Sequence, residues 1–165
     1  MHPGCNLSVM TLPLQRFRGS DEVVLGRLGP LFLNMWFKVP TLQALETLRV
    51  AQQQLKEPHV VLTVLQEIPR GSMPDDARDL AARIYDEGLG RVQAHANVVE
   101  VKGFFGAAVR AVMSSSNLIK PGAYPTKIYS TVDEAAPWLA TMTTALHASC
   151  SAVAIADAVA ELRAR

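Results

Sequence analysis

A short stretch of the chain, HVVLTVL at residues 59–65, limits the possible folds more than any other part of the sequence. Between Val60 and Val64 it carries apolar side chains on both faces of an extended strand, because neighbouring side chains of a strand point to opposite sides. A strand that is apolar on both sides is typical of the middle of a parallel sheet covered by helices on both faces. We therefore expect residues 59–65 to lie at the centre of such a sheet.

Strand and helix patterns alternate on either side of this segment. Residues 22–29 and 31–38 predict a hairpin that turns at Gly29 and Pro30. Further strands are predicted at 91–101 and 126–130, and helices at 41–55, 73–88, 103–117 and from 132 onwards. This order predicts an α/β fold with a mixed, mostly parallel five-stranded sheet, crossover helices and an extended C-terminal helix.

Three hydroxyl side chains stand where predicted helices begin. Thr41, Ser72 and Thr131 each precede a helical pattern, and such side chains accept hydrogen bonds from the free N–H groups of a first turn. After Ser72, proline is tolerated in the first turn, and Asp75 and Asp76 lie near the positive end of the helix dipole. We interpret these acids as capping residues rather than as groups for acid–base chemistry.

The predicted strand 91–101 has one polar and one apolar face. Its polar side chains are expected to face water or lie near an edge, and they are Gln93, His95 and Asn97. Its apolar side chains are Val92, Ala94, Ala96 and Val98. The helix that follows is expected to cover the sheet with Phe104, Phe105, Ala108, Val109 and Val112. The glycines of GFFG, residues 103–106, are interpreted as a tight turn, with anion binding by backbone N–H groups as the alternative.

The serines of AVRAVMSSSNLI, residues 108–119, lie where an apolar helical pattern ends. We interpret them as the polar end of a helix, because Asn117 tolerates the left-handed conformation and Ser side chains bond to nearby backbone groups. A nucleophilic serine would need an adjacent base, and the spacing identifies none.

The C-terminal segment continues helical spacing beyond what a small sheet needs. An unbroken helix from Trp138 to Leu162 would be about 37 Å long at ~1.5 Å per residue. Its narrow apolar seam predicts either a second chain or a helical hairpin that bends near residues 149–151. We favour a homodimer through this helix over the hairpin.

Composition excludes several classes of protein. With 165 residues, 49% of them hydrophobic, the chain can bury the core of one domain, while a net charge of +1 argues against nucleic acid as a partner. No stretch is long and apolar enough for a membrane span, and the separated Cys5 and Cys150 indicate thiols in a reducing, cytoplasmic compartment. His147 precedes Cys150 by three residues, but two ligands do not make a zinc site, so we expect neither metal nor cofactor.

The C-terminal half of the chain resembles the STAS domain, the fold named for sulfate transporters and anti-sigma factor antagonists. The resemblance rests on AVRAVMSSSNLI followed by KIYSTVDEAAPWL, where [ST]-x-x-E-A-x-x-x-L runs from Thr131 to Leu139, and on the order of elements from 21 to 145. It implies a STAS-like domain at 21–145. Residues 1–20 mix Pro, Gly and Arg with short apolar pieces and are expected to form an N-terminal arm, and the helical extension at 146–165 is not covered by the resemblance.

The same resemblance implies a site in the loop between the third strand and the second helix. STAS domains carry a regulated serine there, and here that loop is QEIPRGSMPDD, residues 66–76. Ser72 is the candidate phosphorylation site, although the usual Asp-Ser pair is missing and Asp75 and Asp76 would repel a phosphate. The predicted partner-binding residues are Glu67, Arg70, Ser72, Asp75 and Asp76.

We therefore predict a non-enzymatic regulatory or scaffolding module of bacterial signalling type. It binds a protein partner through loop 66–76 and the helix that follows, and it has no catalytic residues. The alternative is a STAS-like domain that holds a small molecule or lipid.

Overall fold

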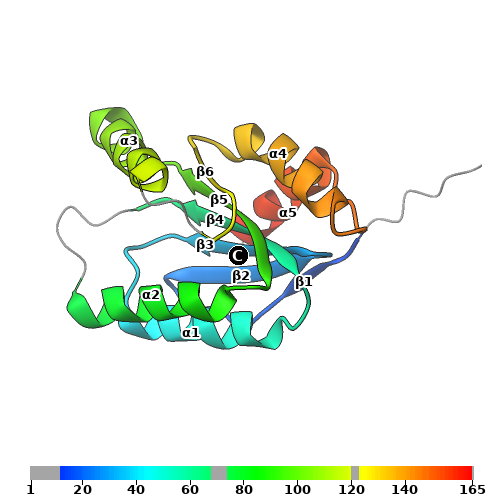
Figure 1. Cartoon of the computed structure of the whole chain (residues 1–165), viewed down its shortest axis with the longest axis horizontal. Coiled ribbons are helices and arrows are strands. Elements are labelled where there is room, and N and C mark those ends of the chain that lie inside the picture. The colour runs from blue at the N-terminus through cyan, green and yellow to red at the C-terminus, as the bar shows by residue number, and fades with distance from the viewer. Residues whose placement is uncertain (1–11, 68–73, 120–122, 165) are drawn as a thin grey trace, which may run out of the picture.

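The computed structural model describes residues 12–67, 74–119 and 123–164. Within these ranges the chain forms one six-stranded mixed sheet with helices on both sides (Figure 1). The strands follow one another across the sheet in chain order: β1 Leu14–Arg16, β2 Val23–Leu28, β3 Leu31–Trp36, β4 His59–Leu65, β5 Val92–Val99 and β6 Thr126–Tyr129.

The pairing of the strands confirms the predicted fold class in its main lines. β1, β2 and β3 pair antiparallel, whereas β3, β4, β5 and β6 pair parallel, so β4 lies between two parallel neighbours as expected. The predicted count of five strands was wrong, because β1 belongs to the segment interpreted as an arm. With three residues, β1 is too short to give a periodic pattern.

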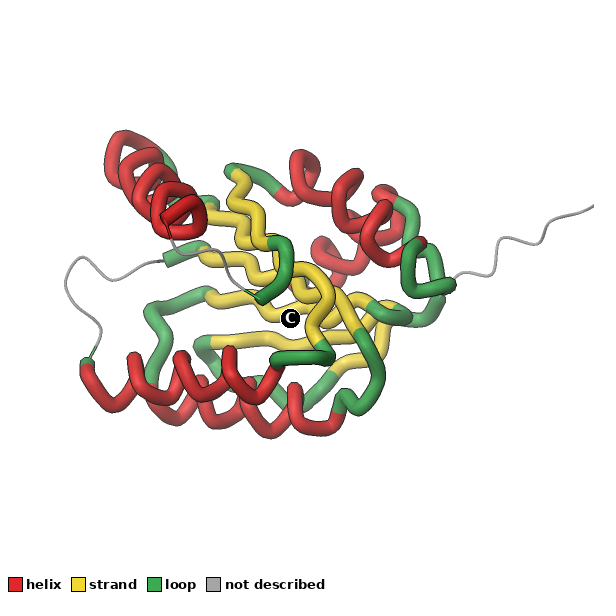
Figure 2. The backbone as a smooth tube through the Cα atoms, viewed as in Figure 1, coloured by secondary structure: helices red, strands yellow, loops and turns green. Residues whose placement is uncertain are grey.

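Five helices connect and cover the strands within the described residues: α1 Leu42–Gln54, α2 Asp75–Gly88, α3 Gly103–Ile119, α4 Val132–Thr144 and α5 Ala152–Arg163. Figures 1 and 2 show α1 and α2 together on one side of the sheet and α4 and α5 on the other, while α3 stands apart from both pairs. The core is therefore split by the sheet into two layers.

Both layers are apolar where the central strands pass between them. On the α4–α5 side, Leu33, Leu62 and Ala96 pack in one cluster with Leu139 and Leu162. On the α1–α2 side, residues of the same strands, including Phe32 and Val61, pack with Leu45 and Leu80. All six residues of β3 are buried. Coverage on both faces was predicted from the apolar run of β4, and the neighbouring strand β3 is covered on both faces as well.

Two of the three predicted caps are confirmed. Thr41 Oγ1 accepts a hydrogen bond from Ala44 N at 3.2 Å, and Thr131 Oγ1 accepts one from Glu134 N at 3.2 Å. The cap at α2 was wrong: Pro74 occupies the N-cap position without a side-chain cap bond, and Ser72 lies outside the described residues.

A register shift changes the face of one predicted core residue. The pairing of β4 with β5 slips between His59 and Val60, so Val92 packs toward α2, beside Gly88. Ala94, by contrast, packs on the α4–α5 side. The prediction that Val92 shares the face of Ala94 was therefore wrong, because an extra residue in one strand reverses the alternation on one side of it.

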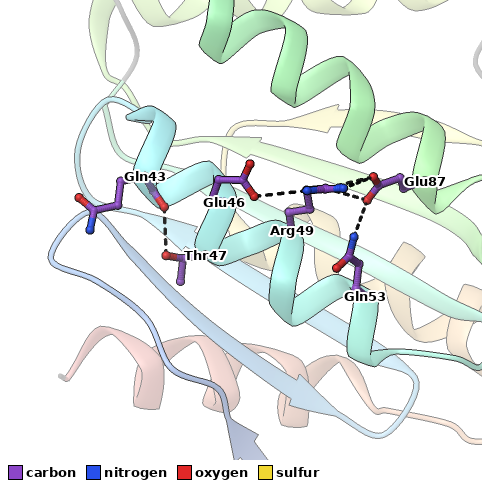
Figure 3. A network of polar contacts seen from close by, with 6 residues as sticks. All are labelled: Gln43, Glu46, Thr47, Arg49, Gln53 and Glu87. Carbon is purple, nitrogen blue, oxygen red and sulfur yellow. Dashed lines mark hydrogen bonds and ion pairs between the residues drawn. The ribbon is translucent and has the colours of Figure 1, made fainter.

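Helices α1 and α2 are joined by a polar network on their outer surface (Figure 3). Arg49 donates to both carboxylate oxygens of Glu87, with Nη2 to Oε1 at 2.6 Å and Nε to Oε2 at 3.0 Å. Gln53 Nε2 adds a bond to Glu87 Oε2 at 3.0 Å. The Arg49 guanidinium lowers the pKa of the Glu87 carboxyl, so the pair stays charged and its two-point geometry fixes how the helices align.

The C-terminal segment is a helical hairpin rather than one long helix. It turns between α4 and α5, where His147 has φ 60° and Ser151 Oγ accepts a bond from Ala154 N at 3.1 Å to begin α5. Of the predicted seam, Cys150, Val159 and Leu162 are buried in the core of the same chain, whereas Val153 is exposed. The seam that favoured a homodimer is thus filled by the sheet, and the homodimer itself stays a prediction.

Replacing Leu162 by alanine tests this packing. Leu162 is fully buried, and its side chain lies 3.2 Å from where a Cβ on Gly26 would stand. Leu162→Ala should lower the free energy of unfolding by about 2–5 kcal/mol, because it leaves a cavity against the sheet. Val153→Ala, on the exposed side of α5, should change it by less than about 0.5 kcal/mol. Equal effects in urea denaturation would show that α5 does not pack as described.

Candidate functional site

The carboxyl ends of β4, β5 and β6 lie at one edge of the sheet because these strands are parallel. Glu67 is exposed just after β4, and Asp75 and Asp76 are exposed in the first turn of α2, where Asp75 forms an ion pair with Arg78. Arg70 and Ser72 lie outside the described residues. Within the described part of the chain, no hydrogen bond or ion pair joins Glu67 to either aspartate.

Helix α3 is the main departure from the predicted packing. Its expected core residues face solvent, with Phe104 at 90%, Val112 at 65% and Phe105 at 41% exposure. Ala108 is exposed as well, and Val109 is half-buried. The prediction that this helix covers the sheet was therefore wrong.

The polar face of β5 gives the physical reason for this departure. A right-handed crossover from β5 to β6 directs α3 toward the face that α1 and α2 cover. On that face β5 carries exposed Gln93 and half-buried His95 and Asn97, so it offers little apolar surface to pack against. The expectation that these side chains are partly wet is confirmed, although β5 lies between two strands rather than at an edge.

The first turns of α3 are fixed to the end of β5. Arg110 Nη1 donates to the carbonyls of Val99 at 2.9 Å and Val101 at 3.2 Å. A Cβ at Gly106 would stand 1.8 Å from the Val101 oxygen, and Gly103 has φ +79°. Both positions therefore favour glycine because of the backbone geometry. This agrees with their interpretation as a tight turn.

The serine triplet does not end this helix. Ser114 is exposed, and α3 runs on through the triplet to Ile119, so the prediction of a helix end there and of a left-handed Asn117 was wrong. Three consecutive serines weaken the apolar pattern of a helix without breaking its backbone hydrogen bonds, so the helix continues where its apolar pattern ends.

A cavity of about 530 Å³ opens at the edge between the ends of β5 and β6, and we call it the carboxyl-edge crevice. Its polar lining residues are Gln66, Glu100, Lys102, Arg110, Ser130, Thr131 and Arg163. Arg163, at the end of α5, forms an ion pair with Glu100. A neighbouring cavity of about 470 Å³ shares this pair and is also lined by Asp133 and Asp157.

Part of this crevice could have been predicted from the order of elements. Residues just after parallel strands gather at one edge of a sheet, so Lys102 and Ser130 could have been named from the predicted order of elements. Arg163 could not, because it reaches the crevice only through the fold-back of α5.

One hydroxyl–imidazole pair lies on the sheet surface. Thr63 Oγ1 is 2.8 Å from His95 Nε2, which places a hydroxyl beside a base in the manner of an activated nucleophile. Burial lowers the pKa of His95 to about 4, so its imidazole is neutral but a weak base at neutral pH. The pair therefore acts as a cross-strand hydrogen bond.

Other reactive side chains are placed in structural roles. The thiol of Cys150 is buried 3.2 Å from the Leu28 carbonyl, and burial raises its pKa. His147 is exposed in the turn before it, so the two residues do not share a helix face. No three His, Cys, Asp or Glu side chains of the described ranges are grouped to hold a metal ion.

A further cavity lies at the opposite edge of the sheet. It measures about 860 Å³, and its lining includes Leu12, Leu14, Pro30, Pro58 and Leu146. Its charged lining residues Arg27 and Glu57 pair with each other at 3.4 Å, which leaves mainly apolar surface.

Comparison with known proteins adds no family. No protein-family model matches the chain, and no significant match is found among curated proteins or solved structures. Among the helices of the described ranges, none combines the length and apolar character that crossing a membrane requires.

The neutral state of His95 predicts a pH dependence of stability. Between about pH 4 and 6.5 the unfolded chain binds a proton at this position that the folded chain does not. The free energy of unfolding should therefore rise with pH across this window, by about 3 kcal/mol for this residue. His95→Gln should remove that part of the slope, whereas Gln93→Asn on the same strand should keep it. An unchanged slope in His95→Gln would contradict the buried, neutral imidazole.

Proposed function

We propose that this chain is a non-enzymatic regulatory or scaffolding module that binds a protein partner at the carboxyl edge of its sheet. The observation that carries the proposal is the exposure of Phe104 and Val112 on a helix whose composition suits a core. The partner would cover this outer face of α3 together with loop 66–76.

The exposed apolar surface supports a partner because it is costly in water. Phe104 and Phe105 precede further exposed apolar positions at Ala108 and Val112 along the same helix. Burying an aromatic or aliphatic side chain of this kind is worth about 1.5–3 kcal/mol. Apolar patches rimmed by polar residues mark protein interaction sites, whereas isolated exposed apolar residues need no such explanation.

The predicted loop and the exposed helix begin at the same place. Gln66, at the start of loop 66–76, lines the carboxyl-edge crevice with Lys102, which directly precedes α3, and with Arg110, which lies within α3. A partner seated on α3 would therefore also meet Glu67 and the residues that follow it. Arg70, Ser72, Asp75 and Asp76 belong to this proposed surface, and phosphorylation of Ser72 is proposed as its regulation.

The chemistry of the surface describes the partner. Apolar side chains of α3 lie beside the cationic Lys102 and Arg110, so the fitting segment is apolar with acidic residues at one end. A helix laid along α3 would satisfy both requirements.

A non-enzymatic role is supported by the chemistry of the polar groups. Within the described residues, the one hydrogen bond between a hydroxyl and an imidazole joins Thr63 to His95. Because His95 is a weak base, it is poorly suited to activate the Thr63 hydroxyl as a nucleophile. The resemblance of the sequence to STAS domains supports the same role. The alternative of a small-molecule or lipid site is favoured by the mainly apolar cavity at the opposite edge.

Charged substitutions on α3 test the proposal. The double variant Phe104→Glu with Val112→Glu should lose at least about tenfold of the partner captured from an extract of its native cells, because it places charge in the contact. Val153→Glu, equally exposed but on α5, should capture the partner as the unchanged chain does. Thermal unfolding of both variants should match the unchanged chain. Capture of equal amounts of the partner by the double variant and by Val153→Glu would contradict the proposal.

A further inference from the structure

We propose that the carboxyl-edge crevice is a binding site for a small anion that carries a phosphate or carboxylate group. The proposal concerns a ligand that occupies a cavity beside the first turns of α3. It does not depend on a protein partner covering the outer face of that helix.

The topology of the sheet creates the crevice. The helix after β6 is α4, which packs with α5 on one face of the sheet. The helix after the neighbouring parallel strand β5 is α3, which does not belong to that layer. Two adjacent parallel strands whose following helices diverge leave an opening at their carboxyl ends, and open α/β sheets bind ligands at such points. The crevice lies at this point, since Val99 ends β5, residues 100–102 follow it, and Ser130 and Thr131 follow β6.

The charges that line the crevice favour an anion. Lys102, Arg110 and Arg163 are cationic, and Glu100 is the one carboxylate of its lining. Glu100 is already paired with Arg163, so Lys102 and Arg110 are left as the excess positive charge of the lining. The neighbouring cavity shares the Glu100–Arg163 pair and is also lined by Asp133 and Asp157, but neither aspartate lines the crevice itself.

Arg110 is held in place before any ligand arrives. Its Nη1 is anchored on the carbonyls of Val99 and Val101, which fixes the plane of the guanidinium at the crevice. Those two bonds use only Nη1, and the fork geometry of a guanidinium suits phosphate and carboxylate oxygens. A pre-positioned arginine loses less side-chain entropy on binding than a mobile one.

The size and the neutral lining define the rest of the ligand. A cavity of about 530 Å³ lies within the ~300–1,000 Å³ of typical small-molecule sites. Gln66 and Ser130 add an amide and a hydroxyl that can bond to polar atoms of the ligand. The crevice therefore fits a small polar metabolite with one strongly anionic group better than an apolar ligand.

Nuclear magnetic resonance of the full chain can test this with two probes, inorganic phosphate and citrate, at constant ionic strength. Saturable shifts are expected for the backbone amides of residues 100–103 and 130–132. Lys102→Gln should weaken binding by at least about fivefold, the loss of one charge-assisted contact. Lys56→Gln, an exposed lysine between α1 and β4, is the matched control and should bind as the unchanged chain does.

The outcomes separate the ligand classes and the two proposals. Tighter binding of phosphate would identify a phosphorylated ligand, and tighter binding of citrate a carboxylated one. A neutral double variant, Phe104→Gln with Val112→Gln, should keep its affinity for the preferred probe, because it removes apolar surface from α3 without adding negative charge beside Lys102 and Arg110. No saturable shift up to about 20 mM of either probe, shifts confined to other residues, or equal affinity in Lys102→Gln and Lys56→Gln would overturn the site.

Discussion

The structure depends on the burial of the parallel strands from both sides. β3 and β4 carry apolar residues on both faces, so neither strand is stable unless helices cover each face. The α1–α2 pair covers one face, and the fold-back of α5 beside α4 completes the other, where Leu139, Ile155 and Leu162 are fully buried. The hairpin of the C-terminal helices is thus a requirement of the sheet, which explains why their seam is filled within the chain.

The same requirement explains what the fold leaves open. The polar side chains of His95 and Asn97 on β5 leave little apolar surface against which the third crossover helix, α3, could pack. Instead, α3 contacts the end of β5 through Gly106 and Arg110. One strand therefore produces both features of the carboxyl edge: an apolar helix without a cover and a charged crevice beside it. A scaffold that is closed around its centre and open at one edge is well suited to recognition, since the open edge can vary without loss of the core.

Much of the fold could be predicted from the sequence because the relevant signals are local. The double-sided run of β4, the hairpin turn at Gly29 and the threonine caps of α1 and α4 each lie within a few residues of the element they define. The errors arose where position depends on distant contacts. Helix α5 is buried because it packs against the sheet, and the side of the sheet to which Val92 points is set by a register shift between β4 and β5. The exposure of α3 depends on the polar side chains of β5. The crevice was missed for the same reason, because Arg163 and Lys102 meet only in the folded chain.

Hydrogen exchange under native conditions tests most directly whether the sheet is closed by its own C-terminal hairpin while α3 remains outside the core. Amides of β4 and of the last turns of α5 should exchange only through global unfolding, with one common free energy, and those of α3 through local opening at a clearly lower free energy. Exchange of α5 as fast as that of α3, or protection of α3 equal to that of β4, would contradict the account.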